Sequence, residues 1–454
     1  MNQDADAYQQ TLDYLYGFVD YSLTRNFQYS PENFNLDRMT KLVAGLDHPE
    51  RKYPVIHIAG TKGKGSTGAM IAAGLQAAGY KTGFYISPHL EDFCERIQIN
   101  REHIPAHRLV EIVAQMKPLI EKFQRLTTFE LTTAAGFLYF AQEQVDIAVI
   151  EVGLGGRLDS TNVVQPLVSV ITSISLDHTQ ILGDTVDKIA AEKAGIIKPY
   201  RPVVVSAQKP EAFAVIQDIA RQRNAPLFHA DEQYQAVIRE RNLEYQCFSI
   251  LPKKDLTENA VEVKMPLLGD HQVENALTAW TALKIVREQG VVLSNEDILR
   301  GLAKVEWQAR FEVIHQNPTI VADSAHNRDS ALKLMHTVKS HFPDNPIVVI
   351  FGASDDKDIE GMFAEILPHV SQLILTRSVH PRSCVPEKLE QMASEYGIPT
   401  IVRQPLEMAV EEALRMLTKD HVLLATGSIF VAAGARKFVR QMFKPAPLDR
   451  LGNE

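Results

Sequence analysis

The sequence predicts two α/β domains in succession, with a mainly parallel, doubly wound sheet in the first and a smaller Rossmann-like layer in the second. Short apolar runs alternate with helical patterns up to Ser206, and the same alternation returns after Trp307. The runs are almost continuously apolar, which is typical of parallel strands that helices cover on both faces. At 454 residues the chain is also too long for one ordinary domain.

The apolar runs give the elements of the first domain in order. Five of them predict the strands of its sheet: Val55–Ala59, Thr82–Ile86, Ile147–Val152, Leu167–Ile174 and Pro202–Ser206. A small antiparallel sheet is expected over 233–265, in runs that begin at Ala236, Tyr245 and Ala260. Helical patterns return at 271–288 and 295–303.

A second series of strand patterns predicts the other domain. Its expected strands are Thr319–Ala322, Pro346–Phe351, Gln372–Thr376, Thr400–Val402 and His421–Ala425. We place the boundary near Lys304–Arg310, which gives domains at 1–306 and 307–442. The remaining residues, 443–454, are expected to form a flexible tail.

Composition restricts the class of protein. A formal net charge of −9 argues against a protein that coats nucleic acid, and no apolar run reaches membrane-spanning length. The cysteines Cys94, Cys247 and Cys384 lack metal-ligand spacing and are expected to be free thiols in a reducing compartment. The sequence therefore predicts a cytoplasmic protein that acts on small molecules.

A glycine- and lysine-rich segment, Gly60 to Ser66 with the sequence GTKGKGS, is the most informative motif. A strand, a glycine turn and a helix in succession aim backbone N–H groups at phosphate oxygens. Lys64 would supply a cation for the terminal phosphates, and Ser66 or Thr67 a hydroxyl. The spacing departs from the usual phosphate loop, because Lys64 stands one place early and Gly65 precedes the hydroxyl. A flexible loop that binds no nucleotide is the alternative.

Polar clusters follow three predicted strands of the same domain, beginning at Ser87 (SPH), Glu151 (EVGLGGRLD) and Leu176 (LDHT). If the strands are parallel, these clusters share one edge with the phosphate loop, where α/β folds bind ligands. The Ser87 hydroxyl, the Glu151 carboxylate and the His178 imidazole would then meet at a divalent cation, although imidazole is an unusual ligand for magnesium. Each has a structural alternative: a turn, a strand-end carboxylate and a packed histidine.

Three further features lie outside these clusters. Lys193 lies on a predicted helix among small and apolar residues; a buried lysine there would need a partner or a modification, and a solvated face is the alternative. In the second domain, Asp323-Ser-Ala-His-Asn follows a strand and suits a ribose or amino-acid ligand. Arg310, at the domain junction, would reach a nucleotide held by the first domain and make catalysis depend on closure.

Together these motifs resemble the folylpolyglutamate synthase and dihydrofolate synthase family, within the Mur-ligase superfamily. The resemblance runs from Phe34 to Ser428 and includes the displaced lysine, SPHL with ERIQIN after it, EVGLGGRLD and LDH. It implies a Mur-ligase-like P-loop ATPase domain, a Rossmann-like glutamate-ligase domain and a monomer. The implied activity is ATP-dependent addition of L-glutamate to a folate carboxylate; whether dihydropteroate is also a substrate stays open.

The resemblance also implies roles for individual residues. Those expected to bind ATP are Thr61, Lys62, Gly63, Lys64, Gly65, Ser66, Asn275, Arg310 and Asp323. Those expected to hold two magnesium ions are Ser87, Glu151, His178 and Lys193, the last as a carbamate. Those expected to bind folate or glutamate are Thr128, Phe129, Glu130, Arg157, Leu158 and His326. The expected catalytic residues are Lys64, Lys193 and His326.

The implied chemistry explains the use of ATP. A carboxylate is a poor acceptor for an amine because its leaving group would be an oxide, and phosphorylation supplies a better one. The α-amine of glutamate then attacks the acyl phosphate, and phosphate leaves as the amide forms. Water must be kept from the acyl phosphate, which gives a two-domain cleft its purpose.

The chain departs from the family's pattern at two places. Gln308-Ala309 stands before Arg310 where Pro-Gly is usual, and Asp323-Ser-Ala-His-Asn-Arg328 replaces Asp-Gly-Ala-His-Asn-Pro. Two rival functions remain. One is a Mur-type ligase acting on a UDP-linked muramyl substrate, for which no added N-terminal domain is evident. The other is a nucleotide-dependent regulatory protein with no ligase step.

Overall fold

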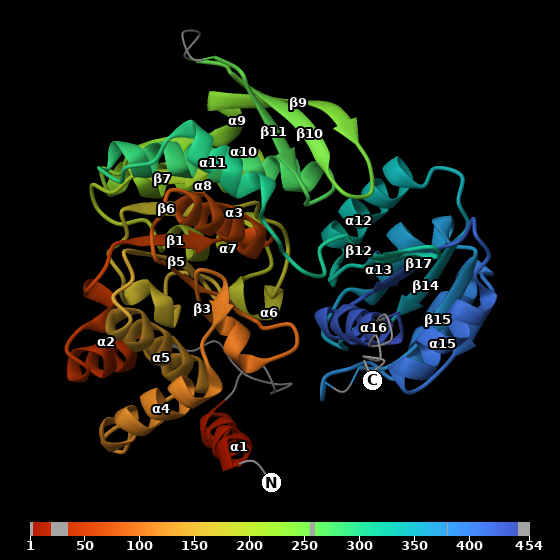
Figure 1. The fold of residues 1–454 in the computed structure, drawn as a ribbon, viewed down its shortest axis with the longest axis horizontal. Coiled ribbons are helices and arrows are strands. Elements are labelled where there is room, and N and C mark those ends of the chain that lie inside the picture. The colour runs from red at the N-terminus through yellow and green to blue at the C-terminus, as the bar shows by residue number, and fades with distance from the viewer. Residues whose placement is uncertain (1–2, 20–34, 255–258, 379, 444–454) are drawn as a thin grey trace, which may run out of the picture. The chain divides into compact units, whose positions relative to one another are not determined.

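The computed structural model describes residues 3–19, 35–254, 259–378 and 380–443, and the chain divides into two compact units, Met1–Trp307 and Gln308–Glu454. Phe34, where the resemblance begins, and the expected tail beyond Phe443 lie outside the described residues. Each unit is built around a sheet of its own (Figure 1).

An eight-stranded sheet, in the order β4-β3-β2-β5-β1-β6-β7-β8, forms the centre of the first unit. From β2 to β8 in this order the strands run parallel, and β3 and β4 add an antiparallel edge. The strands are β1 Val55–Ala59, β2 Thr82–Tyr85, β3 Ile97–Ile99, β4 Glu102–His103, β5 Ile147–Glu151, β6 Val168–Ile171, β7 Val203–Val205 and β8 Leu227–His229. The five predicted runs are all strands, and β6 is shorter than expected at both ends.

Helices cover both faces of this sheet, because alternate strand residues supply two separate cores (Figure 1). Ile56 and Ile58 face a core that α3, α10 and α11 enclose, and Val55 faces the core under α2, α4 and α5. A further apolar cluster lies under α7 and α8. The helices are α1 Gln3–Tyr16, α2 Leu36–Gly45, α3 Lys64–Ala77, α4 Ala106–Ile120, α5 Thr128–Gln142, α6 Thr179–Leu182, α7 Val186–Ala194, α8 Pro210–Gln222, α9 Ala230–Gln233, α10 Asp270–Glu288 and α11 Asn295–Ala303.

Small residues let α3 lie deep in the first unit. It is buried from Ser66 to Leu75, so no polar face is needed. A Cβ at Gly301 of α11 would lie 2.5 Å from the Ala73 carbonyl carbon, and one at Gly74 would lie 2.7 Å from the Leu283 side chain. Close packing against α10 and α11 therefore fixes the helix whose N-terminus carries the phosphate loop.

The expected small antiparallel sheet is present, in the order β11-β10-β9. Its strands are β9 Tyr234–Arg241, β10 Gln246–Pro252 and β11 Val261–Met265. Phe248 and Val263 point into the core that Trp280 of α10 fills, so this sheet extends the cover over one face of the large sheet.

The second unit has a six-stranded sheet in the order β12-β13-β17-β14-β15-β16, parallel except for β12. Its strands are β12 Glu312–Gln316, β13 Thr319–Ala322, β14 Ile347–Phe351, β15 Gln372–Leu375, β16 Thr400–Val402 and β17 Val422–Thr426. Its helices are α12 Arg328–His341, α13 Ile359–Ile366, α14 Pro386–Ala393, α15 Leu406–Met416 and α16 Ile429–Met442. All five predicted strands are present, and β12 was not predicted.

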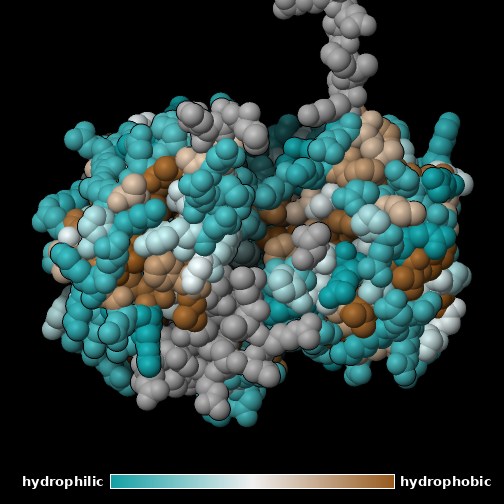
Figure 2. Space-filling view, turned by 90° about the horizontal axis from the view of Figure 1, so that it is seen from below, coloured by the Kyte–Doolittle hydropathy of each residue, from teal (hydrophilic) through white to brown (hydrophobic). Residues whose placement is uncertain are grey.

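Hydrophilic residues dominate the face of the molecule in Figure 2, and hydrophobic residues appear there in small separate groups. Among the described residues no helix has both the length and the apolar character that crossing a membrane requires.

Candidate active site

The GTKGKGS segment joins β1 to α3 at the carboxyl end of the parallel sheet. The N–H groups of Thr61 and Lys62 both donate to the Ser173 carbonyl oxygen, at 2.9 and 3.2 Å, which ties the loop to the chain leaving β6. Helix α3 begins at Lys64, and no side chain caps it at Gly63. The first-turn N–H groups of this helix are therefore available to an anion at its N-terminus.

Two glycines let the loop take this path. Gly63 has φ +85°, and a Cβ there would lie 2.3 Å from the Asn275 side-chain oxygen. A Cβ at Gly60 would lie 1.8 Å from the Thr172 hydroxyl oxygen. The structure thus places Asn275 of α10 directly against the phosphate loop.

Sheet order brings the predicted polar clusters to one edge. Strands β2, β5, β1 and β6 are adjacent and parallel, and Ser87, Glu151, the phosphate loop and Asp177-His178 lie at or beyond their carboxyl ends. The Lys64 ammonium lies 3.7 Å from a Glu151 carboxylate oxygen. The Lys62 ammonium lies 3.0 Å from an Asp177 carboxylate oxygen. This ion pair was not predicted from the sequence.

Lys193 is buried beside this cluster rather than solvated. It lies on α7, is 5 % exposed, and its ammonium donates to the Gly60 carbonyl oxygen at 2.8 Å. Burial, reinforced by the nearby Lys64 ammonium and partly opposed by Asp177, lowers the pKa of Lys193 from 10.5 to about 7. A large fraction of this lysine is therefore the neutral, nucleophilic amine at neutral pH.

The glycine-rich loop after β5 packs against the helix that carries Lys193. A Cβ at Gly156 would lie 2.8 Å from the Glu192 carbonyl oxygen, and one at Gly195 would lie 2.3 Å from the Arg157 Cβ. The Arg157 N–H donates to the Glu192 carbonyl oxygen at 2.8 Å, and its guanidinium pairs with the Glu192 carboxylate at 2.7 Å. Loop and helix are thus held as one piece.

Buried hydrogen bonds anchor the same loop to the centre of the sheet. The Leu154 N–H and the Thr161 hydroxyl donate to Asp159, at 2.9 and 2.5 Å. The Thr161 hydroxyl oxygen lies 2.8 Å from His57 Nε2, and because this hydroxyl donates to Asp159, His57 is the donor to it. Burial lowers the pKa of His57 to about 3, so the imidazole stays neutral. Sequence reasoning missed His57, although one polar residue inside the apolar run Val55–Ala59 was a usable signal.

The residues expected to bind folate divide into two groups. Phe129 lies against the glycine loop, since a Cβ at Gly153 would lie 2.4 Å from its ring, and Leu158 is half-buried in that loop. Thr128 and Glu130 already have structural partners: the Thr128 hydroxyl donates to the Leu15 carbonyl oxygen at 2.9 Å. Glu130 forms a capping box with Thr127 at the start of α5 and pairs with Arg38 at 3.0 Å.

Apart from Lys193, the residues expected to hold magnesium supply one carboxylate, one hydroxyl and one imidazole. Among the described residues, no three His, Cys, Asp or Glu side chains are grouped closely enough to hold a metal ion. Glu151 is buried, Ser87 is half-buried, and the His178 side chain is 38 % exposed. This set fits magnesium, because that ion keeps several waters and binds through one or two carboxylates together with substrate phosphates.

His89, the neighbour of Ser87 beyond Pro88, has a structural partner. Its Nδ1 accepts a hydrogen bond from the Arg96 guanidinium at 2.9 Å, and burial lowers its pKa to about 4.

Thr67 lies on α3, next to Ser66. Within the described part of the chain, its buried hydroxyl finds no hydrogen-bond partner, so a second hydroxyl besides that of Ser66 lies near the start of that helix.

The second unit places its three predicted residues, Arg310, Asp323 and His326, around the end of β13. Asp323 accepts the N–H groups of Phe311 and Ala325, at 2.7 and 2.8 Å. Burial raises the pKa of Asp323, and the Arg310 guanidinium opposes that rise. His326 Nδ1 lies 2.8 Å from the Ser324 carbonyl oxygen and donates to it.

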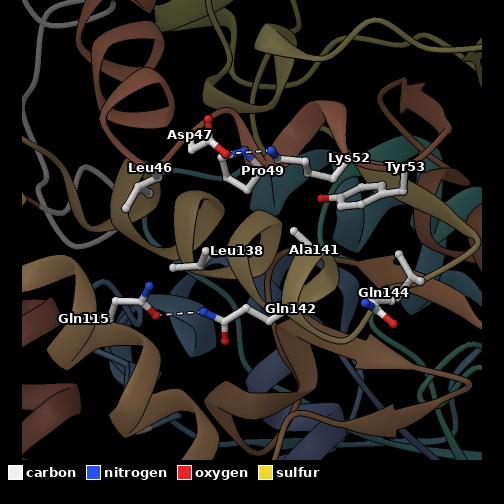
Figure 3. A pocket seen from close by; sticks show the side chains of 11 residues that line it. Leu46, Asp47, Pro49, Lys52, Tyr53, Gln115, Leu138, Ala141, Gln142 and Gln144 are labelled. Carbon is white, nitrogen blue, oxygen red and sulfur yellow. Dashed lines mark hydrogen bonds and ion pairs between the residues drawn. The ribbon is translucent and has the colours of Figure 1, made fainter.

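A separate hollow of about 510 Å³ lies at the opposite edge of the first sheet (Figure 3). Its lining residues precede β1 and β5, so they lie at the amino ends of these strands. Four of its polar side chains already form two pairs, Asp47 with Lys52 and Gln142 with Gln115. The phosphate loop lies at the carboxyl ends of the strands, away from this hollow.

The fold and the loop define a protein of the Mur-ligase type. Residues 58–283 match the model of the Mur ligase middle domain, and residues 309–429 match that of the Mur ligase glutamate ligase domain. The chain belongs to the family of folylpolyglutamate and dihydrofolate synthases. It is 34 % identical over 443 residues to the dihydrofolate synthase/folylpolyglutamate synthase of Bacillus subtilis, covering 95 % of this chain and 99 % of that protein.

Solved structures agree with this membership. The Mycobacterium tuberculosis folylpolyglutamate synthase complexed with ADP has a TM-score of 0.87 at 29 % identity, covering 96 % of this chain and 98 % of that one. A folylpolyglutamate synthase complex with AMPPCP and folate has a TM-score of 0.81 at 32 % identity, covering 96 % and 100 %.

Proposed function

We propose that this protein is an ADP-forming ligase that joins L-glutamate to the carboxylate of a folate through an acyl phosphate. The observation that carries the proposal is the juxtaposition of the uncapped N-terminus of α3, Lys64 and Glu151 at one edge of the sheet. Family membership supports folate as the substrate class, because the relatives are named as folylpolyglutamate and dihydrofolate synthases. Dihydropteroate is a second candidate acceptor, to be compared directly.

The chain's own residues account for phosphoryl transfer. The first-turn N–H groups of α3 receive the phosphates, and the Lys64 ammonium stabilises the charge on the transferred group as the folate carboxylate attacks. We assign Thr61, Lys62, Gly63, Gly65, Ser66 and Asn275 to nucleotide binding with them. From the second unit we assign Arg310 and Asp323 to the nucleotide, and His326 to the incoming glutamate.

We further propose that Glu151, Ser87 and His178 hold magnesium and that Lys193 binds a second ion after carbamylation. When bound, these ions would neutralise phosphate charge and polarise the transferred phosphoryl group. The lowered pKa of Lys193 supports the second assignment, because only the neutral amine adds to carbon dioxide. Labelled bicarbonate should give a carbamate carbon resonance in the protein that disappears in Lys193→Met; a resonance that survives this substitution would belong to another amine.

Phe129, Arg157 and Leu158 are our candidates for the walls of the folate pocket. Thr128 and Glu130, whose polar atoms have structural partners, would act by holding α5 in place beside Phe129. A Phe129→Ala variant should therefore raise KM for the folate, while Glu130→Gln should mainly lower thermal stability.

An isotope experiment tests the reaction. With ¹⁸O in the folate carboxylate, one labelled oxygen should appear in the released phosphate, and its absence would rule out the acyl phosphate. ADP release should require both L-glutamate and a folate or dihydropteroate. ATP hydrolysis that is indifferent to both would support the regulatory alternative. ADP release with a UDP-linked muramyl acceptor instead would support the Mur-type alternative.

A further inference from the structure

The backbone around Arg310 is held in a form that favours glycine, although no glycine is present. Ala309 has φ +52° and Phe311 has φ +48°. Residues with a Cβ are strained in this left-handed region, and both side chains are buried, so the turn cannot relax freely into solvent. The direction of Arg310, which lies between them, depends on whatever holds the turn.

Four hydrogen bonds clamp the turn to the end of β13 and the start of β12. The Phe311 N–H donates to Asp323 at 2.7 Å, and the Ala309 N–H donates to the Glu312 carboxylate at 2.8 Å. The Ala309 carbonyl oxygen accepts both the N–H of Ser324, at 3.0 Å, and its hydroxyl, at 2.9 Å. Of these bonds, only the last needs a serine at position 324.

The Ser324 hydroxyl also affects the guanidinium of Arg310. Arg310 Nη1 donates to the same Ala309 carbonyl oxygen at 3.0 Å, so this oxygen has three donors for two lone pairs. With the hydroxyl present, the carbonyl remains satisfied when the guanidinium turns toward an anion. Without it, the Ser324 N–H would still donate to that carbonyl oxygen, but the guanidinium would be the donor to its second lone pair, which would be left unfilled when the guanidinium turns away.

We propose that Ser324 is a positioning residue for Arg310: its hydroxyl holds the Ala309 carbonyl and so keeps a non-glycine turn in the left-handed form that presents the guanidinium. Each of the two segments that depart from the family's pattern has one residue in place of a glycine, Ala309 in the first and Ser324 in the second, and these two replacements are then one coupled change. This inference rests on the proposed role of Arg310 at the nucleotide.

A cycle of four proteins tests the coupling: the unaltered chain, Ser324→Ala, Ala309→Gly and the double variant. With Ala309 present, loss of the hydroxyl should raise KM for ATP about fivefold and change kcat by less than about twofold. In the Ala309→Gly background, where glycine adopts positive φ without strain, the same loss should raise KM by less than about twofold. Equal effects in both backgrounds, or no effect in either, would overturn the proposal.

Amide hydrogen exchange gives a readout that does not depend on ATP. Ser324→Ala should speed exchange of the Phe311 N–H about fivefold with Ala309 present and clearly less in the Ala309→Gly background. Ser371→Ala is the matched control, because its hydroxyl also donates to a backbone carbonyl at 2.9 Å in the same unit, but at the amino edge of the sheet. This control should change neither KM for ATP nor exchange at Phe311.

Arg310→Ala separates the two proposals. If this variant binds ATP normally, the nucleotide role of Arg310 fails, while coupled exchange in the cycle would still establish the clamp. If Arg310→Ala raises KM but the exchange effects are additive, Arg310 acts on the nucleotide and Ser324 does not position it.

Discussion

Replacing Lys193 by methionine should stabilise the first unit while abolishing turnover. Burial beside Lys64 lowers the pKa of Lys193 from 10.5 to about 7. At about 1.4 kcal/mol per unit, holding the charged form in the folded protein costs about 5 kcal/mol. Methionine has a similar length and no charge, so it removes this cost together with the hydrogen bond to Gly60.

The dependence on pH has a definite sign. Below pH 7 the lysine is protonated in the folded and the unfolded chain, and the full cost is present. Between about pH 7 and 10.5 the unfolded chain binds a proton that the folded chain has lost, so stability rises with pH. The cost falls to about 4 kcal/mol near pH 7.5 and to about 1 kcal/mol near pH 9.5.

Methionine forfeits the 2.8 Å hydrogen bond to the Gly60 carbonyl, worth about 1 kcal/mol. The variant should therefore gain about 3 kcal/mol near pH 7.5 and less than about 1 kcal/mol near pH 9.5. The gain at the lower pH corresponds to a rise in Tm of about 5 °C.

Urea unfolding in buffers purged of carbon dioxide measures this gain without interference from a carbamate. Both tryptophans, Trp280 and Trp307, lie in the first unit, so their fluorescence reports on it. Lys188→Met is the control, because Lys188 lies on the same helix, is exposed and pairs with Asp184. No gain at Lys193, or an equal gain at both pH values, would refute a buried, destabilised ammonium. Near-normal turnover would refute its catalytic role.

Other predictions follow from the same contacts. Glu151→Gln should lower kcat about a hundredfold and leave ADP binding nearly unchanged, as an ADP-release assay and a nucleotide titration would show; a change of less than about threefold would contradict its role. Thr161→Val should lower the free energy of unfolding by about 3 kcal/mol, because His57 and Asp159 both lose a buried partner, and should raise KM for the folate. An unchanged KM for the folate would show that the hydrogen bonds of Thr161 do not affect the folate pocket. Mn²⁺ should bind at least about tenfold more tightly with ADP or an ATP analogue present than alone, since Lys64 pairs with Glu151 until phosphates draw it away; equal affinities in a calorimetric titration would contradict this coupling.

Strand prediction was most reliable where burial is complete, although it missed the short buried strand β3 and found the half-buried strand β16. Every residue of β1, β5 and β14 is buried, so their sequences are apolar apart from His57 and Glu151 and are easily found. Strand β4 has two exposed residues, Glu102 and His103, and no residue of β12 is fully buried. These edge strands are fixed by pairing with a neighbour rather than by their own apolar pattern, which a single sequence does not reveal.

Prediction of the candidate site from the sequence was limited in a similar way. The strand pattern correctly predicted that Ser87, Glu151 and the phosphate loop lie at one end of the sheet, because parallel strands bring their carboxyl ends together. Contacts between side chains distant in sequence were not predictable, such as the hydrogen bond from His57 to Thr161 or the pairing of Lys62 with Asp177. For Glu130, the capping-box pattern that begins at Thr127 was readable in the sequence and indicated a structural role.

The charges at the phosphate loop suggest how nucleotide and metal binding depend on each other. Lys62 and Lys64 each lie beside a carboxylate, Asp177 and Glu151, at the edge that would receive phosphates. These contacts compensate the two ammonium groups before an anion arrives, at a site where unpaired buried charge is costly. Under the proposed function, an arriving triphosphate would offer Lys64 a stronger partner than a carboxylate at 3.7 Å, and the contact between Lys64 and Glu151 would open. The Glu151 carboxylate that we propose for a cation would then face that cation together with the phosphate oxygens, so we expect nucleotide and metal binding to be coupled through the exchange of partners at Lys64.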